Sequence, residues 1–192
     1  MMKRLCSIIT LLVSFLLLTG KIQARITMPS LFSDGMVLQQ QNLVAIWGSS
    51  DRKQQRITVK PSWSNKEYTT VSDDLGRWKM KLETPVYGGP YNIEVSDGET
   101  VRLSNILIGE VWLCSGQSNM QMPVEGWGKV KNYQQEVAQA NYPDIRLMTV
   151  SNTISLSPSQ EFTAVGGGWQ VCSSVTIREF SATAYFFGRE IA

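Results

Sequence analysis

The sequence predicts a small antiparallel β-sandwich followed by the incomplete start of a three-layer α/β domain. Between residues 25 and 103, short segments alternate between apolar and polar residues and are separated by turns rich in Asp and Gly, which is typical of antiparallel strands. From residue 104 on, a continuous apolar run is followed by helical and strand patterns in turn, which is typical of a parallel sheet covered by helices. We therefore expect a β-sandwich domain over 25–103 and the beginning of an α/β domain over 104–192.

The first 24 residues have the layout of a secretory signal peptide. Lys3 and Arg4 precede an apolar stretch from Leu5 to Leu18, and Ala24 is the small residue before the expected cleavage point. The apolar stretch is too short to span a bilayer, and an uncleaved anchor is the alternative. We expect residues 1–24 to be removed and the protein to be exported to a periplasmic, extracellular or lumenal compartment.

The charge balance argues against nucleic acid and membrane surfaces as partners. The chain has 18 basic and 16 acidic residues, and loss of Lys3, Arg4 and Lys21 with the leader leaves 15 basic against 16 acidic. No basic stripe remains to attract phosphates or anionic lipids. The chain contains no histidine and no cluster of cysteines, so we expect no metal and no other cofactor.

Two-residue alternation defines the strands of the first domain. It places Ile57 and Val59 on one buried face, and Trp78, Met80 and Leu82 on another. The tryptophans Trp47, Trp63 and Trp78 fit either a carbohydrate-binding platform or ordinary core and surface aromatics, and both interpretations stay open. The expected strands are 43–48, 56–60, 68–71, 77–82, 91–95 and 100–103.

The second half predicts two parallel strands and two helices. Residues 106–114 form the apolar run of a strand covered on both faces, 132–140 a helix, 144–150 a second strand, and 176–192 a final helix after a loop of some 25 residues. So few elements do not close the edges of a parallel sheet. We therefore expect the chain to stop inside this domain. The final helix presents an apolar stripe of Ile177, Phe180, Ala184, Phe187 and Ile191.

Two cysteines and two tryptophans, within or after the apolar run, have competing interpretations. Cys114 and Cys172 are the two cysteines outside the leader, and we favour two buried thiols over a disulfide. Trp112 and Trp169 are expected to pack in the core rather than border a sugar site.

The charged residue of the run, Glu110, requires a partner or an edge position because a buried carboxylate needs compensation. We expect a salt bridge.

The strongest functional candidate is Ser118, in the stretch Cys-Ser-Gly-Gln-Ser-Asn-Met that directly follows the apolar run. Open α/β sheets place their chemistry at the carboxyl ends of strands. Gly116 permits a sharp turn, the following amides are available for a developing oxyanion, and Asn119 is expected to hold the loop through its side chain. The structural alternative is a capping box, since Ser118 is followed three residues later by Gln121.

The stretch "GEVWLCSGQSNMQMPV" resembles the nucleophile block of the sialate O-acetylesterase family, a branch of the SGNH hydrolases with a flavodoxin-like three-layer fold. "MPSLFSDGMVLQQ", "GRWKMKL", "GGPYNIEV", "DIRLMTV" and "REFSATAYFFGREI" resemble the amino-terminal half of that family, in the same order. The resemblance implies that Ser118 attacks an acetyl ester of a carbohydrate and that its amide contributes to the oxyanion hole. Gly116, Gln117 and Asn119 match the motif around it.

The sequence departs from the family pattern where the rest of the catalytic machinery is expected. The family's glycine block, asparagine block and late Asp-x-x-His are absent, and the histidine count is zero. Loss of one triad member lowers kcat by about 10⁴- to 10⁶-fold. We therefore expect the front part of an esterase, close to inactive alone. The alternatives are a non-catalytic exported glycan-binding protein and a naturally truncated product of low solubility.

Overall fold

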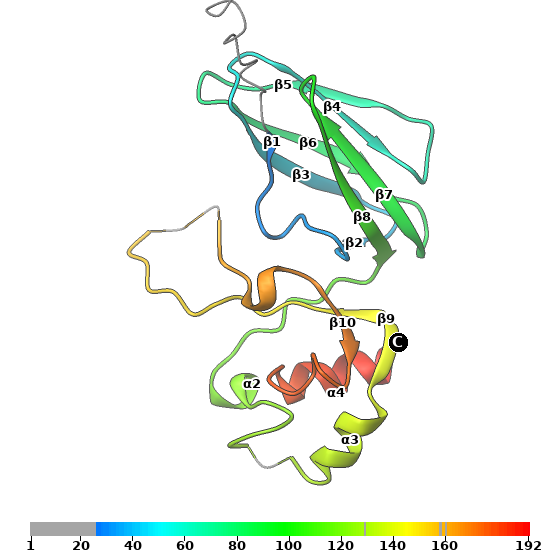
Figure 1. Cartoon of the computed structure of the whole chain (residues 1–192), viewed down its shortest axis with the longest axis vertical. Coiled ribbons are helices and arrows are strands. Elements are labelled where there is room, and N and C mark those ends of the chain that lie inside the picture. The colour runs from blue at the N-terminus through cyan, green and yellow to red at the C-terminus, as the bar shows by residue number, and fades with distance from the viewer. Residues whose placement is uncertain (1–25, 129, 158, 160) are drawn as a thin grey trace, which may run out of the picture.

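A computed structural model of the chain describes residues 26–128, 130–157, 159 and 161–192 (Figure 1). The leader predicted at 1–24 lies outside the described residues. Within the described ranges, no helix has both the length and the apolar character needed to cross a bilayer. The strands are β1 Ile26–Thr27, β2 Val37–Gln39, β3 Leu43–Ser50, β4 Arg56–Pro61, β5 Tyr68–Val71, β6 Arg77–Glu83, β7 Gly88–Ser96, β8 Thr100–Gly109, β9 Asn141–Leu147 and β10 Gln170–Ser173.

The amino-terminal half consists of two sheets, which Figure 1 shows layered in the upper part of the molecule. One sheet has the order β1-β3-β6 and the other β2-β8-β7-β4-β5. All pairs are antiparallel except β2 with β8, which is parallel. Each of the six strands expected in this half is present, as β3 to β8.

One hydrophobic core is shared by the two sheets. Ile57 and Val59 of one sheet are fully buried, and so is Leu82 of the other, with Trp78 at 4% exposure and Met80 packed against the same cluster. The predicted alternation is therefore confirmed at these five positions. Because successive side chains of a strand point to opposite faces, the polar residues between them face solvent.

The strand predicted over 106–114 is wrong in its extent and surroundings. Residues 106–109 continue β8, where Ile106 and Ile108 lie in the buried core of the molecule. Residues 110–114 are not strand and are exposed, with Leu113 at 92%. The last ladder pair joins Gln39 to Gly109, and no described strand runs alongside the chain beyond it. Without a neighbour to pair its backbone, an apolar segment does not stay a strand.

The carboxyl-terminal half packs around a second, smaller core, in the lower part of Figure 1. β9 pairs with β10 in antiparallel fashion, so the predicted parallel arrangement is wrong here. β10 lies inside the segment predicted as loop and supplies the partner that β9 needs. The helices are α2 Ser118–Gln121, α3 Tyr133–Gln139, the short 3-10 helix η1 Val165–Gly167, and α4 Ala182–Ile191.

The final helix is shorter than predicted. It starts at Ala182 because Ser181 is its N-cap, whose hydroxyl accepts a hydrogen bond from the Ala184 amide at 3.2 Å. Of the predicted apolar stripe, Ile177 and Ala184 are buried, whereas Phe187 is 40% and Ile191 51% exposed. The stripe therefore does not rest on a sheet over its whole length.

Candidate active site

Ser118 is the first residue of α2 and is exposed to solvent. The N-cap of this helix is Gln117, and it makes no side-chain capping bond. The capping-box alternative, in which the Ser118 side chain caps the helix, therefore does not describe this structure. The Ser118 hydroxyl has no hydrogen-bond partner among the described residues.

The backbone around Ser118 leaves two amides available. The amides of Met120 and Gln121 donate to the Gln117 carbonyl at 2.9 and 3.0 Å. Those of Ser118 and Asn119 donate to no residue within the described ranges, as is usual for the first amides of a helix. Such donors suit the oxyanion that forms on an ester carbonyl oxygen when a serine attacks the carbonyl carbon, and this role of the Ser118 amide stays a prediction.

The neighbouring motif residues differ in what they contribute. A Cβ on Gly116 would lie 3.2 Å from the Cβ of Met120, so a larger residue here would require the Met120 side chain to shift by a few tenths of an ångström. Gln117 and Asn119 are exposed. Asn119 joins the loop to α4 through its backbone carbonyl, which accepts from the Thr183 hydroxyl at 2.9 Å, and not through its side chain as predicted.

Further backbone bonds anchor the region after α2 to the start of α4. The Ala182 amide donates to the Met122 carbonyl at 2.8 Å, and the Val124 amide donates to Phe180 at 3.1 Å. Nothing in the motif around Ser118 indicates that Thr183 and Ser181 are neighbours of the serine segment. The one available signal was Ser181 itself, a preferred N-cap residue before an apolar helical pattern.

The segment that leads to Ser118 is held at its start by Glu110. Its carboxylate accepts hydrogen bonds from the side-chain amides of Gln39 at 2.9 Å and Gln40 at 2.7 Å. These two bonds, first from Gln39 and then from Gln40, hold the pKa of Glu110 below its usual range. The predicted salt bridge is wrong, because no described cation pairs with Glu110 and two neutral amides take that place.

The two tryptophans of this half behave differently. Trp112 is 58% exposed and packs edge-on against Phe187 of α4, with ring centroids 5.1 Å apart, so its predicted place in the core is wrong. Trp169 packs against the core of the two sheets and donates from its indole nitrogen to the Leu31 carbonyl at 2.9 Å, which confirms core packing there.

Both cysteines outside the leader are free thiols. Cys172 is buried as expected, and burial raises its pKa to about 11. Cys114 is exposed, in contrast to the prediction, because the segment around it is not covered by other strands.

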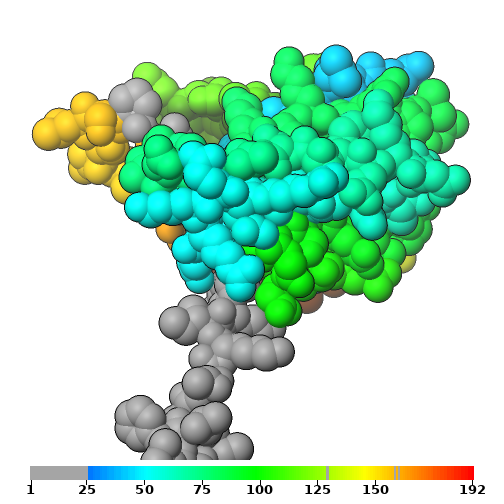
Figure 2. Space-filling model, turned by 90° about the horizontal axis from the view of Figure 1, so that it is seen from above, coloured from blue at the N-terminus to red at the C-terminus, as the bar shows by residue number. Residues whose placement is uncertain are grey.

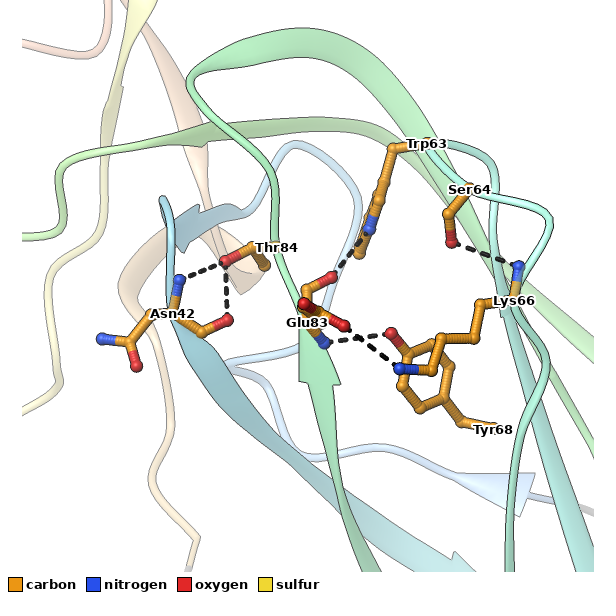
Figure 3. A network of polar contacts seen from close by, with 7 residues as sticks. All are labelled: Asn42, Trp63, Ser64, Lys66, Tyr68, Glu83 and Thr84. Atoms are coloured by element: carbon orange, nitrogen blue, oxygen red, sulfur yellow. Dashed lines mark hydrogen bonds and ion pairs between the residues drawn. The ribbon is translucent and has the colours of Figure 1, made fainter.

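The aromatic residues of the sheets do not form one carbohydrate platform. Trp78 is buried and Trp47 packs edge-on against Phe32 at 4.6 Å. Figure 3 shows how Trp63 and its neighbours are used instead: the Trp63 indole donates to the Glu83 carbonyl at 3.0 Å, and the Tyr68 hydroxyl accepts from the Glu83 amide at 3.1 Å. These polar groups engage the Glu83 backbone at the end of β6, which is an edge strand of its sheet.

Within the part of the chain that the structure describes, no side chain forms a hydrogen bond with the Ser118 hydroxyl that would mark it as a general base. The chain has no histidine, and within the described residues no group of three His, Cys, Asp or Glu side chains is placed to hold a metal ion. The segment between β9 and η1 projects from one side of the molecule in both Figure 1 and Figure 2, with Ile154 and Leu156 fully exposed.

Comparison with known proteins identifies the relatives of the chain. No protein-family model matches it. It is 30% identical over 182 residues to sialate O-acetylesterase from Pongo abelii and 29% identical over 177 residues to that from Homo sapiens, each time over 84% of the chain. The chain is a homologue of the sialate O-acetylesterases. This confirms the predicted resemblance.

A solved structure supports the same relationship. The crystal structure of a carbohydrate acetylesterase from Xanthomonas citri matches with a TM-score of 0.79 and 33% identity over 87% of the chain. The chain covers 37% of that protein and spans about a third of the length of the curated sialate O-acetylesterases it matches.

Proposed function

We propose that this chain is part of an exported serine esterase that removes O-acetyl groups from sialic acids or related acetylated glycans. The observation that carries the proposal is the free, exposed Ser118 hydroxyl at the start of α2, within a homologue of sialate O-acetylesterases. The proposed architecture is a β-sandwich domain whose last strand, β8, ends at Gly109, later than the boundary expected near residue 103, and an SGNH-type three-layer domain that begins after it. Export follows from the leader proposed at residues 1–24.

In the proposed reaction, the Ser118 oxygen attacks the acetyl carbonyl and its proton passes to a general base. The tetrahedral oxyanion accepts a hydrogen bond from the Ser118 amide. The sugar hydroxyl leaves with a proton, and water then releases acetate from the acetyl-serine. Because the chain has no histidine, we propose that the base and the other oxyanion donors come from residues outside this sequence, so that the chain alone is close to inactive.

The test compares two serine variants in a longer form of the protein that supplies a histidine base. With an O-acetylated sialic acid as substrate, Ser118→Ala is expected to lower kcat by about 10⁴-fold or more. Ser157→Ala is the matched control, because Ser157 is an exposed serine in the projecting segment. An undiminished rate in Ser118→Ala contradicts the proposal.

The missing base favours one alternative, a non-catalytic glycan-binding protein. Its signature is binding of an acetylated glycan to the two-sheet half, with no acetate released by any longer form. The internal use of the Trp63 and Tyr68 polar groups argues against a platform there. Acetate release that depends on Ser118 excludes this alternative.

A further inference from the structure

The chain leaves β8 through a compact set of side-chain hydrogen bonds, which we call the Gln–Glu clamp and which consists of Gln39, Gln40 and Glu110. Both oxygens of the Glu110 carboxylate are used, one by each glutamine amide, at 2.9 and 2.7 Å. The remaining oxygens of the glutamines accept backbone amides: Gln39 from Val111 and Gln40 from Tyr87, each at 3.0 Å. Each of these four side-chain oxygens and both side-chain nitrogens therefore has a partner.

The clamp joins three segments that are far apart in the sequence. They are the end of β2, the residues that follow β8, and the loop before β7. Backbone bonds reinforce two of these junctions, from the Gln40 amide to the Gly109 carbonyl at 2.8 Å and from the Gln41 amide to Pro85 at 2.9 Å. The chain at Glu110, where it leaves the two sheets, is thus tied to the end of β2 and, through Gln40, to the loop before β7.

The chain needs such a tie because its sheet ladder ends at Gly109. From there to α2 it is exposed and follows no described strand. The Val111 amide is the last one before Ser118 that a described side chain binds, and its acceptor is Gln39. At the other end, Thr183 holds α2 through the Asn119 carbonyl. The serine segment is therefore fixed at two points, by the clamp and by α4.

We propose that Gln39, Gln40 and Glu110 are positioning residues, which set where the segment carrying Ser118 leaves the two sheets. The proposal rests on the esterase function proposed above. A serine nucleophile must reach its base and its oxyanion donors within a fraction of an ångström, and a misplacement of about 1 Å costs about 10²-fold in rate. Removal of the clamp is therefore expected to lower kcat more than it raises KM, because the clamp acts through the segment that carries Ser118.

The directions of the hydrogen bonds allow a swap experiment. Glu110→Gln places an amide opposite the Gln39 amide, so two donors meet; Gln39→Glu places two carboxylates together. In the double variant Gln39→Glu/Glu110→Gln, the carboxylate at position 39 accepts from Val111 and from the new amide, whose oxygen still accepts from Gln40. Every contact is kept and one direction is reversed, so the double variant rescues the clamp if these bonds matter.

A matched control lies at the end of β3 and the start of β6, far from the clamp. The Gln54 side-chain amide donates to Asp74 at 2.8 Å, in the turns near the end of β3 and the start of β6. The clamp lies at the opposite end, where the register pairs Leu43 with Glu83. Asp74→Ala removes a similar exposed glutamine–carboxylate bond without touching the serine segment.

The first measurement is hydrogen exchange at the Val111 amide in the 192-residue chain. Each single clamp variant is expected to raise the exchange rate about tenfold, the double variant to restore it, and Asp74→Ala to leave it unchanged. Equal exchange in all variants overturns the clamp, whether or not the protein is an esterase.

The second measurement is kcat and KM for an acetylated sialic acid in the longer form, per active serine titrated with a fluorophosphonate. We expect kcat to fall about 10- to 100-fold in each single variant, with KM within about twofold, and to recover in the double variant. Unchanged kcat, or no recovery in the double variant, overturns the positioning role. An inactive wild-type longer form contradicts the esterase function and the positioning role with it, while hydrogen exchange still decides whether the clamp exists.

Discussion

Replacement of Ile106 by Ala tests which core the end of β8 belongs to. The Ile106 side chain is fully buried in the core shared by the two sheets. Loss of three buried carbon groups costs about 2.4 kcal/mol at about 0.8 kcal/mol each, and the residual cavity brings the expected loss to about 3–4 kcal/mol. The free energy of unfolding is measured by urea denaturation, followed by tryptophan fluorescence.

The matched control is Leu113→Ala, seven positions further along the same apolar run. Leu113 is 92% exposed, so its truncation is expected to change the free energy of unfolding by less than about 0.5 kcal/mol. If 106–114 were one covered strand, both variants would lose stability to a similar degree. Equal losses would therefore refute the placement of the strand end at Gly109.

Three further predictions concern the cap of α4, the carboxylate of the clamp and the thiols. Ser181→Ala removes the N-cap bond to Ala184 and is expected to cost about 1 kcal/mol of unfolding free energy; Ser181→Asp, which keeps an acceptor, is expected to retain it. Because the pKa of Glu110 is lowered, the carboxylate contributes fully to stability above the ordinary pKa of 4.5, and this contribution is lost as the pH falls through the lowered pKa. The carboxyl ¹³C shift of Glu110 is therefore expected to titrate with a midpoint below pH 4.5. A midpoint above pH 4.5 would contradict the hydrogen bonds from the two glutamines. A thiol reagent at pH 8 is expected to modify exposed Cys114 at once and Cys172, with its pKa of about 11, only on unfolding; equal rates would show that Cys172 is not buried.

The strands of the first half were predictable because their signal is local. Ile57 and Val59 stand two positions apart in the sequence and Trp78 and Leu82 stand four apart, and such even spacing alone puts each pair on one face of its strand. Residues 106–114 misled the prediction for a related reason. Apolar character indicates that a segment can be covered, but only a neighbouring strand decides whether it is, and that neighbour is not encoded in the segment itself.

The candidate site likewise combines features that local sequence predicts with contacts that it does not. Ser118 and Gly116 stand out within seven residues of sequence, because a glycine and a serine on a turn form a local pattern. The Gln–Glu clamp does not, since Gln39 and Glu110 lie 71 positions apart and each has an unremarkable local context. Thr183 is 64 positions from its partner Asn119. Contacts of this kind depend on how the sheets bring the chain back, which periodicity does not reveal.

The exposed segment between the clamp and α2 also affects how the chain behaves in solution. Trp112 and Leu113 expose apolar side chains beside backbone groups that no described strand engages, and such a stretch can recruit the same stretch of another molecule into a growing intermolecular sheet. Concentrated samples should accordingly scatter more light with time. Leu113→Lys would act as a gatekeeper that slows this growth while leaving the folded cores untouched.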